Sequence, residues 1–282
     1  MKRLVVTADD FGLALEVNEA VEAAHRDGIL TAASLMVAEP AAADAVGRAR
    51  RLPLLRVGLH LVLVEGRPTL PPERIPDLVD GEGRFRTDMA RLGLDIFARP
   101  RARRQLDAEI AAQFEAFAAT GLALDHVNAH KHFHLHPTIA GAVLRIGRRY
   151  GLRALRVPLE PVSVLAGIER QAMRPAALVA APWARLLRLQ ARRAGLVTPD
   201  AVFGLAWSGA MTTERLAGLL SRLPDGLTEI YSHPATADAF PGSAPGYRYV
   251  EELRALTAPP VREALRAAGA QIGGYADFSG AA

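Results

Sequence analysis

The chain has 282 residues, a formal net charge of +4, a hydrophobic fraction of 50% and no cysteine. This length suits one α/β domain with a large core, and the mixed charges argue against disorder. The lack of cysteine excludes disulfides, thiol nucleophiles, iron–sulfur clusters and cysteine-ligated zinc. We expect one domain over residues 1–282, with insertions at about 67–104 and 159–207 that form loops or a cap.

The basic charge is almost entirely arginine, because lysine occurs only at Lys2 and Lys131. No stripe interleaves basic and aromatic residues, so we expect no nucleic-acid partner. The apolar run that follows the basic start ends at Asp9 and Asp10, which is unlike a secretion signal. No apolar run approaches the roughly 18 residues of a membrane span. We therefore expect a cytoplasmic protein, with peripheral contact to the inner membrane left open.

Short apolar runs alternate with amphipathic segments along the chain. In chain order, the pattern predicts a strand at 4–8, a helix at 17–27, a strand at 30–37, a helix at 41–51, a strand at 56–62, a helix at 106–119, a strand at 124–130, a helix at 138–150, and strands at 155–157, 228–232 and 270–275. This alternation is typical of a parallel sheet covered by helices. About seven strands suit either a barrel or an open sheet.

Two neighbouring carboxylates, Asp9 and Asp10, follow the first predicted strand. Adjacent carboxylates repel at neutral pH unless something compensates them, and a divalent cation beside them would do so. One of the two would then ligate the metal while the other accepts a proton. The alternative is a turn in which an Asp caps the next helix.

Histidines supply the other candidate ligands. His60 lies within an apolar strand, where it is either a core residue or a ligand. Five of the eight histidines fall between His126 and His136. Strand alternation puts His126, Asn128 and His130 on one face, and His130 falls at the carboxyl end of the strand, where α/β sheets place their sites. Such a dense run is typical of metal binding, with a functionless surface run as the alternative.

One Asp with two neutral imidazoles suits zinc, cobalt, manganese or iron. A divalent metal there would lower the pKa of a bound water, and a second carboxylate beside it would serve as a base. Late in the chain, His233 ends a strand, where it suits a general acid, a helix cap or a core residue. Arg156 ends another strand and would orient a carboxylate or pair at the surface.

Several separate motifs resemble the YdjC-like carbohydrate deacetylases. They are TADDFG at 7–12, GILTAASLMV at 28–37, VGLHL at 57–61 with EGRP at 65–68, VNAHKHFHLHP at 127–137, RVP at 156–158 and EIYSHP at 229–234. They occur in the order of the family and cover most of the chain. The form of the histidine motif most resembles the hopanoid-biosynthesis-associated HpnK branch, although members more typically read Asp-Ser-His where this chain has Asn128-Ala129-His130.

The resemblance implies a deformed (β/α) barrel related to polysaccharide deacetylases. It implies that Asp10, His60 and His130 hold one divalent metal, with zinc favoured by ligand type and magnesium, manganese or cobalt as alternatives. It implies that Asp9 is the catalytic base and His233 the catalytic acid. The remaining candidates are expected to bind substrate, and His134 is also a second choice to His130 as a metal ligand. These candidates are Phe11, His132, His134, Arg156 and Glu229.

The implied reaction removes an N-acetyl group from a glucosamine-type sugar, which in the HpnK branch is attached to bacteriohopanetetrol. A chitooligosaccharide deacetylase, another metal hydrolase such as a phosphoesterase, and a non-catalytic lipid- or sugar-binding protein are the alternatives. A homodimer is expected because related barrels often associate. The basic, apolar stretch at 183–193 would rest on a membrane surface or form an ordinary cap helix.

Overall fold

The computed structural model describes residues 1–169 and 175–278. Its centre is a seven-stranded sheet in the order β4-β3-β2-β1-β6-β5, with β7 pairing beside β1. Every pairing between these strands is parallel. The strands are β1 (Lys2–Phe11), β2 (Ala32–Leu35), β3 (Arg56–Leu61), β4 (Val127–Ala129), β5 (Ala201–Phe203), β6 (Gly226–Ser232) and β7 (Gln271–Ile272).

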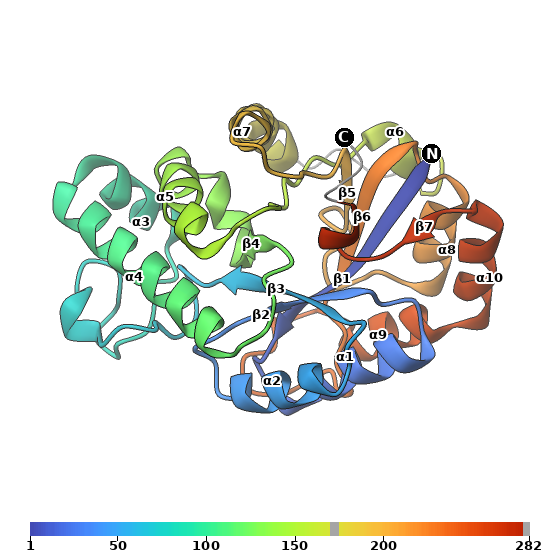
Figure 1. Cartoon of the computed structure of the whole chain (residues 1–282), viewed down its shortest axis with the longest axis horizontal. Helices are drawn as coiled ribbons and strands as arrows, with labels where there is room; N and C mark the ends of the chain where they lie inside the picture. Colours follow the sequence, from blue (N-terminus) through green and yellow to red (C-terminus); the bar gives the residue numbers. More distant parts are fainter. Residues whose placement is uncertain (170–174, 279–282) are drawn as a thin grey trace.

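The two edges of the sheet are bridged by the irregular segment 153–159. On one side, the backbone N–H of Arg156 donates to the carbonyl of Val127 in β4 at 3.0 Å. On the other, the N–H of Val202 in β5 donates to the carbonyl of Leu159 at 2.9 Å. The sheet therefore curls into a deformed barrel, which confirms the expected fold class (Figure 1).

Helices cover the outside of the curled sheet (Figure 1). They are α1 (Leu15–Asp27), α2 (Ala42–Arg50), α3 (Met89–Ala98), α4 (Pro100–Ala119), α5 (Pro137–Gly147), α6 (Val162–Ala166), α7 (Pro175–Arg193), α8 (Thr213–Ser221), α9 (Tyr249–Thr257) and α10 (Pro259–Ala268). Short 3₁₀ helices lie at Pro72–Arg74, His130–Leu135, Arg148–Tyr150 and Ala276–Phe278.

Burial explains why these segments form these elements. Eight of the ten residues of β1 are buried, as expected for a parallel strand covered on both faces. In α5, Pro137 occupies the first turn, where its missing N–H removes no helical hydrogen bond. The buried residues Ile139, Val143 and Ile146 then recur at helical spacing, so the helix buries one apolar stripe, and its main helix neighbour is α4.

The predicted elements before residue 150 agree with the structure to within a few residues, except around the first insertion. The segment 67–104, expected as a loop, contains α3, and α4 begins at Pro100 rather than at residue 106. The predicted strand at 155–157 is only an isolated bridge from Leu155 to Val127. The segment 159–207 holds α6, α7 and also β5, a three-residue strand that the sequence analysis missed. Across the described part of the chain, none of the helices is both long and apolar enough to span a bilayer.

Candidate metal and catalytic site

A cavity of about 1940 Å³ opens at the carboxyl ends of the central strands. Its lining includes Asp9 and Asp10 from β1, His60 from β3, His130 after β4 and His233 after β6. Parallel strands end at the same edge of a sheet, so residues far apart in sequence meet there. This is the edge at which α/β barrels place their active sites.

A bulge at the end of β1 turns both neighbouring aspartates toward the cavity. Pairing between β1 and β2 shifts register between Ala8 and Phe11. Within that interval Asp10 has a φ of +62°, a left-handed conformation that Asp tolerates better than most residues. In a regular strand, Asp9 and Asp10 would point to opposite faces. The bulge breaks this alternation, and both side chains line the cavity.

Asp10, His60 and His130 form a compact group of candidate metal ligands. One ligand atom from each lies within 4.8 Å of the other two. Oδ1 of Asp10 is 3.3 Å from Nε2 of His60 and 3.3 Å from Nδ1 of His130. Oδ1 of Asp10 and Nε2 of His60 are buried and have no hydrogen-bond partner among the described residues. Buried polar atoms left in this way fit a cation, and one carboxylate with two imidazoles suits a catalytic zinc or a similar metal.

Electrostatics within this group also favours a charged Asp10. Burial raises the pKa of Asp10, but the close imidazoles of His130 and His60 outweigh burial and hold that pKa well below its ordinary value. Burial lowers the pKa of His130, yet the neighbouring Asp10 carboxylate leaves it raised overall. The carboxylate is therefore ionised and ready to ligate a cation.

Asn128 orients His60 from behind. Its Oδ1 lies 2.6 Å from Nδ1 of His60 and, being only an acceptor, requires a proton on that nitrogen. Nε2 of His60 is then unprotonated and free to bind a metal, an arrangement common for histidine ligands. The amide nitrogen of Asn128 donates to Oδ1 of Asp9 at 3.1 Å and to Oγ of Ser34 at 2.8 Å. One neutral side chain thus contacts both the ligand group and the candidate base.

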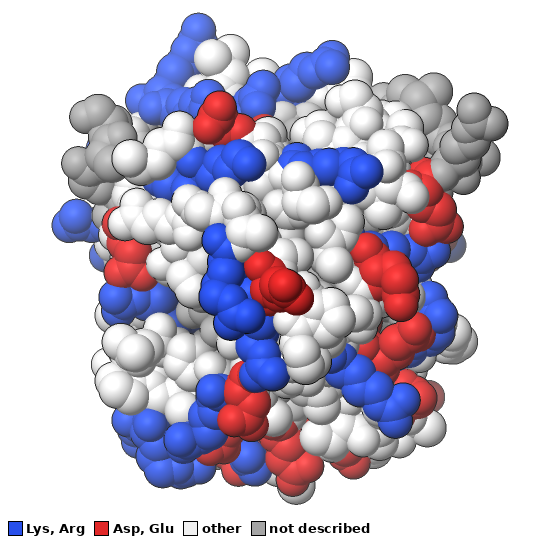
Figure 2. All heavy atoms as spheres, turned by 90° about the vertical axis from the view of Figure 1, so that its right-hand side faces the viewer, with Lys and Arg blue, Asp and Glu red and all other residues white. Residues whose placement is uncertain are grey.

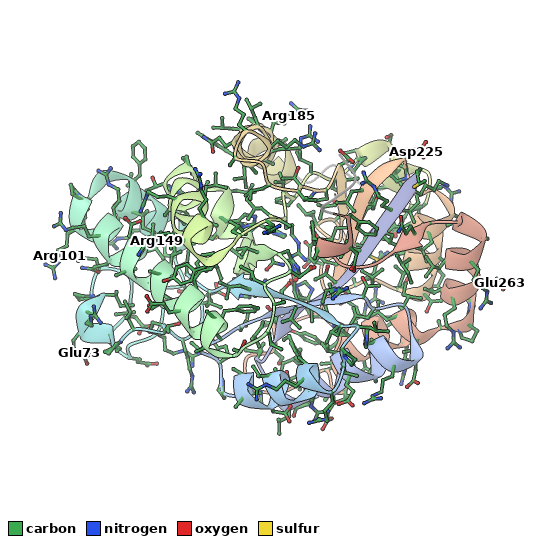
Figure 3. All side chains as sticks on the ribbon, in the orientation of Figure 1. Glu73, Arg101, Arg149, Arg185, Asp225 and Glu263 are labelled. Carbon is green, nitrogen blue, oxygen red and sulfur yellow. The ribbon has the colours of Figure 1, made fainter. Side chains whose placement is uncertain are left out.

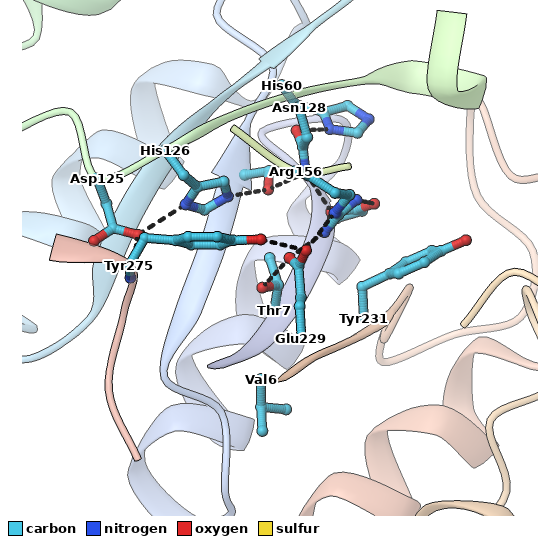
Figure 4. A network of polar contacts seen from close by, with 12 residues as sticks. Val6, Thr7, His60, Asp125, His126, Asn128, Arg156, Glu229, Tyr231 and Tyr275 are labelled. Carbon is cyan, nitrogen blue, oxygen red and sulfur yellow. Dashed lines mark hydrogen bonds and ion pairs between the residues drawn. The ribbon is translucent and has the colours of Figure 1, made fainter. Parts of the chain in front are cut away.

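Arg156 lies beneath the site between two buried carboxylates (Figure 4). Its guanidinium donates to both oxygens of Asp9, at 2.5 and 2.9 Å, and to both oxygens of Glu229, at 2.9 and 2.8 Å. Burial raises the pKa of Asp9, but attraction to Arg156, aided by His60 and His233, holds that pKa below its ordinary value. Asp9 is therefore a fixed anion at neutral pH.

The polar network continues from Asn128 to Tyr275 (Figure 4). Ser34 Oγ contacts Nε2 of His126 at 3.0 Å, and Nδ1 of His126 contacts Asp125 at 2.8 Å. Asp125 also accepts the backbone N–H of Tyr275 at 3.1 Å, while the Tyr275 hydroxyl donates to Glu229 at 2.5 Å. The network therefore closes from Asp125 through Tyr275 and Glu229 back to Arg156.

Gly58 makes room for this network. A Cβ at Gly58 would lie 2.5–2.6 Å from the ring atoms of His126, closer than real Cβ contacts. The ring is held at both nitrogens and cannot move aside without losing a hydrogen bond. The absence of a side chain at this strand position therefore has a packing reason.

The histidine run after β4 does not continue as a strand. It forms short 3₁₀ turns interrupted by a kink at Lys131 and His132, whose φ values are +52° and +54°. His132 lines the cavity, with Nε2 2.9 Å from the Tyr231 hydroxyl. His134 is fully buried, and its Nε2 lies 2.9 Å from the backbone carbonyl of Arg156. Burial lowers the pKa of His134 to about 4, so this ring is neutral and helps to hold the segment that carries Arg156.

His233 lies directly after β6 and lines the cavity. Its ring packs against Tyr231 and Tyr247, with ring centroids 5.7 and 5.2 Å apart. The backbone N–H donates to Glu252, which places the residue without engaging the ring. Nδ1 is buried with no hydrogen-bond partner among the described residues. An imidazole in this position is available to exchange a proton with a bound molecule.

The residues expected to bind substrate occupy two kinds of position, in the cavity lining and beneath it. His132 lines the cavity, whereas the others lie beneath its wall, namely Phe11, His134, Arg156 and Glu229. The sequence analysis did not identify the polar or aromatic partners Ser34, Tyr231, Tyr247 and Tyr275. Ser34 and Tyr231 fall within two of the quoted motifs and Tyr247 and Tyr275 within none, but the role of each is defined only by contacts with residues distant in sequence.

Replacing Arg156 by Met should strongly destabilise the protein. The change would leave Asp9 and Glu229 buried and facing each other without a cation, and breaking a buried pair in this way costs about 3–5 kcal/mol. Denaturant unfolding would measure the loss. As a matched control, Arg145→Met removes an exposed pair with Asp107 and should change stability far less. Equal stabilities for the two variants would contradict the structural role of Arg156.

Replacing Asn128 by Leu should weaken metal binding while leaving the three ligands in place. Without the Asn128 oxygen, His60 loses the contact that fixes its tautomer, and such losses typically lower metal affinity about 10–100-fold. Calorimetric titration with zinc would measure the change. Ser208→Ala, which removes a hydroxyl that contacts Tyr247 rather than the ligand group, is the control. Unchanged affinity in Asn128→Leu would show that His60 is oriented by other contacts.

Comparison with known proteins identifies relatives of the whole chain. The model of the YdjC-like protein family matches residues 3–267. A carbohydrate deacetylase of Brevibacillus brevis is 32% identical over 93% of both chains, and one of Geobacillus stearothermophilus is 33% identical over 97% of both. A human carbohydrate deacetylase is 32% identical over 96% of this chain and 89% of its own.

Solved structures show the same fold. A crystal structure from Enterococcus faecalis, of a protein proposed to act in cellobiose-phosphate cleavage, superposes with a TM-score of 0.77 at 27% identity and covers 98% of both chains. A lactam utilization protein of Thermus thermophilus, at 16% identity and a TM-score of 0.53 over 96% of this chain and 99% of its own, shares the fold. The family match over nearly the whole chain shows that this protein belongs to the YdjC-like family.

Proposed function

We propose that this protein is a metal-dependent carbohydrate N-deacetylase. The observation that carries the proposal is the placement of the Asp9 carboxylate beside a candidate ligand group of Asp10, His60 and His130, with His233 lining the same cavity. The carbohydrate deacetylases among its relatives support the reaction class. Zinc fits the donor set best, and magnesium, manganese and cobalt remain candidates.

Each residue has a distinct task in this mechanism. Asp10, His60 and His130 would hold the cation, which when bound polarises the amide oxygen of the substrate and makes an attacking water more acidic. Asp9 accepts the proton of that water; Oδ2 receives one hydrogen bond from Arg156 and keeps acceptor capacity for another. Arg156 and Asn128 hold the Asp9 carboxylate in one orientation.

His233 supplies the second proton transfer. As the new C–O bond forms and the C–N bond breaks, the departing nitrogen needs a proton, because an amide anion is a poor leaving group. A protonated His233 donates it, and the products are acetate and a free amino sugar. Tyr231 and Tyr247 pack against the ring and restrict its orientation.

For the substrate, we propose N-acetylglucosaminyl-bacteriohopanetetrol. The histidine motif resembles the hopanoid-associated branch, and the cavity has room for more than a sugar. Its volume of about 1940 Å³ exceeds the ~300–1000 Å³ usual for small-molecule sites. Beyond the polar group, its wall includes Phe133, Leu135 and Leu165, which suit an apolar aglycone. A cytoplasmic location and a homodimer remain predictions from the sequence.

Mass spectrometry of two substrates tests this assignment. We expect metal-loaded enzyme to remove acetyl from N-acetylglucosaminyl-bacteriohopanetetrol and to leave N,N′-diacetylchitobiose largely unchanged. Acetyl loss from chitobiose alone would keep the deacetylase and replace the hopanoid by a chitooligosaccharide. Binding of either substrate without acetyl loss, with metal confirmed bound, would favour a non-catalytic binding protein.

Substituting Asp9 by Asn should abolish turnover and spare metal binding. The amide keeps the shape of the carboxylate but cannot act as the base, and loss of a positioned base typically costs about 10²–10⁴-fold in rate. Turnover and zinc titration on the same preparation separate the two effects. Asp10→Asn should instead lose the metal along with turnover. A fully active Asp9→Asn would remove Asp9 from the mechanism.

A further inference from the structure

We propose that the face formed by α3, α6 and α7 docks onto an anionic lipid surface, so that the entrance of the cavity faces that surface. The inference extends the proposed function by naming where an amphiphilic substrate is met. It stands on the distribution of exposed apolar and basic side chains, and its test is independent of turnover.

Exposed apolar residues concentrate on these three helices. Among the described residues, eleven large hydrophobic side chains are exposed, and seven of them belong to α3, α6 or α7. A scatter of single exposed apolar residues is normal, but such a concentration marks an interaction surface. The seven are Met89, Leu94, Phe97, Val162, Trp183, Leu186 and Leu189.

This apolar face surrounds the mouth of the catalytic cavity. Leu94 and Phe97 of α3, Val162 of α6 and Trp183 of α7 all line the cavity that contains Asp9 and Asp10. In Figure 1, α7 and α6 lie along the top of the molecule and α3 lies at its upper left. A lipid surface in contact with this face would therefore lie directly against the cavity entrance.

The packing of α7 fixes which of its sides faces outward. Ala184, Leu187 and Ala191 are buried against the body of the protein. Leu186 and Leu189 lie on the opposite side of α7, where they are exposed and do not line the cavity. Neither the core nor the cavity therefore explains apolar residues at these two positions. A helix with one anchored side and one free apolar side is suited to lie in a lipid interface.

Charge identifies the partner. α7 contains four arginines and no acidic residue. Arg192 pairs with Asp200, whereas Arg185, Arg188 and Arg193 have no carboxylate partner among the described residues. Arg185 extends from α7 at the top of the molecule (Figure 3), and basic side chains gather toward the same edge in Figure 2. Cations beside apolar side chains match anionic headgroups above acyl chains.

A second copy of the chain fits this face less well. A two-fold dimer would bring the same patch of each copy together, so the arginines of α7 would oppose their own equivalents. Headgroup phosphates instead neutralise them. We therefore assign the face to a lipid surface, and dimerisation through it is an outcome that the experiment can detect.

Vesicle sedimentation tests the assignment. The full chain should pellet with vesicles of phosphatidylcholine and phosphatidylglycerol, and much less with phosphatidylcholine alone or at high salt. Leu186→Ser with Leu189→Ser should reduce binding at least about tenfold, since each loses buried apolar contact. Arg185→Glu with Arg193→Glu should abolish the preference for the anionic vesicles. Arg254→Glu with Arg266→Glu makes the same charge change on the exposed surfaces of α9 and α10 and should leave binding largely intact.

The outcomes separate docking from catalysis. Circular dichroism confirms that each variant is folded, and the Leu186 and Leu189 variant should retain acetyl removal from a water-soluble substrate. Wild type that does not bind anionic vesicles, or equal losses in the α7 and the α9–α10 arginine variants, would overturn the proposal. So would a wild-type dimer that the leucine substitutions dissociate without any vesicle binding. Vesicle binding without deacetylation of any substrate would instead overturn the proposed function and leave docking intact.

Discussion

A single buried guanidinium sets the electrostatic balance of this site. Asp9 and Glu229 lie in the interior, where two uncompensated carboxylates would be prohibitively costly, and Arg156 is the cation that contacts both. Its planar fork satisfies two oxygens on each side, which a lysine ammonium could not do with the same directionality. Because this arrangement keeps Asp9 ionised and immobile, the proposed base and the candidate ligand group can adjoin one another without sharing a proton.

Asn128 places a neutral residue at the one point where a further charge would upset that balance. Its carbonyl oxygen accepts from His60 and its amide nitrogen donates to Asp9, so the same side chain serves two opposite hydrogen-bonding needs. A carboxylate in its position could satisfy His60 but would face Asp9 with like charge. A neutral asparagine at this position therefore fits the network, because it satisfies His60 and Asp9 together.

How much of this structure the sequence predicts depends on how far apart along the chain the contacting residues lie. Asp10 follows a predicted strand, His60 lies near the carboxyl end of another and His130 ends a third, and strand geometry alone brings such positions to one edge of a parallel sheet. By contrast, strand alternation could not anticipate the position of His134, because the chain leaves the strand through a kink at the left-handed residues Lys131 and His132. The pairing of Arg156 with Asp9 joins residues 147 positions apart, and no local pattern encodes it. β5 was missed because three residues are too few to show a period.

The place of β1 in the sheet has a consequence for how the protein is made. This strand carries both aspartates, yet it pairs along most of its length with β6, whose residues lie more than two hundred positions later. Tyr275, which closes the network through Glu229, comes still later. During synthesis from the amino terminus, the acidic pair therefore emerges long before β6 and Tyr275. Contacts of such long range form slowly, so β1 can pair early with β2, but its β6 edge and the Asp9 carboxylate stay without their partners until β6 and Arg156 have been translated.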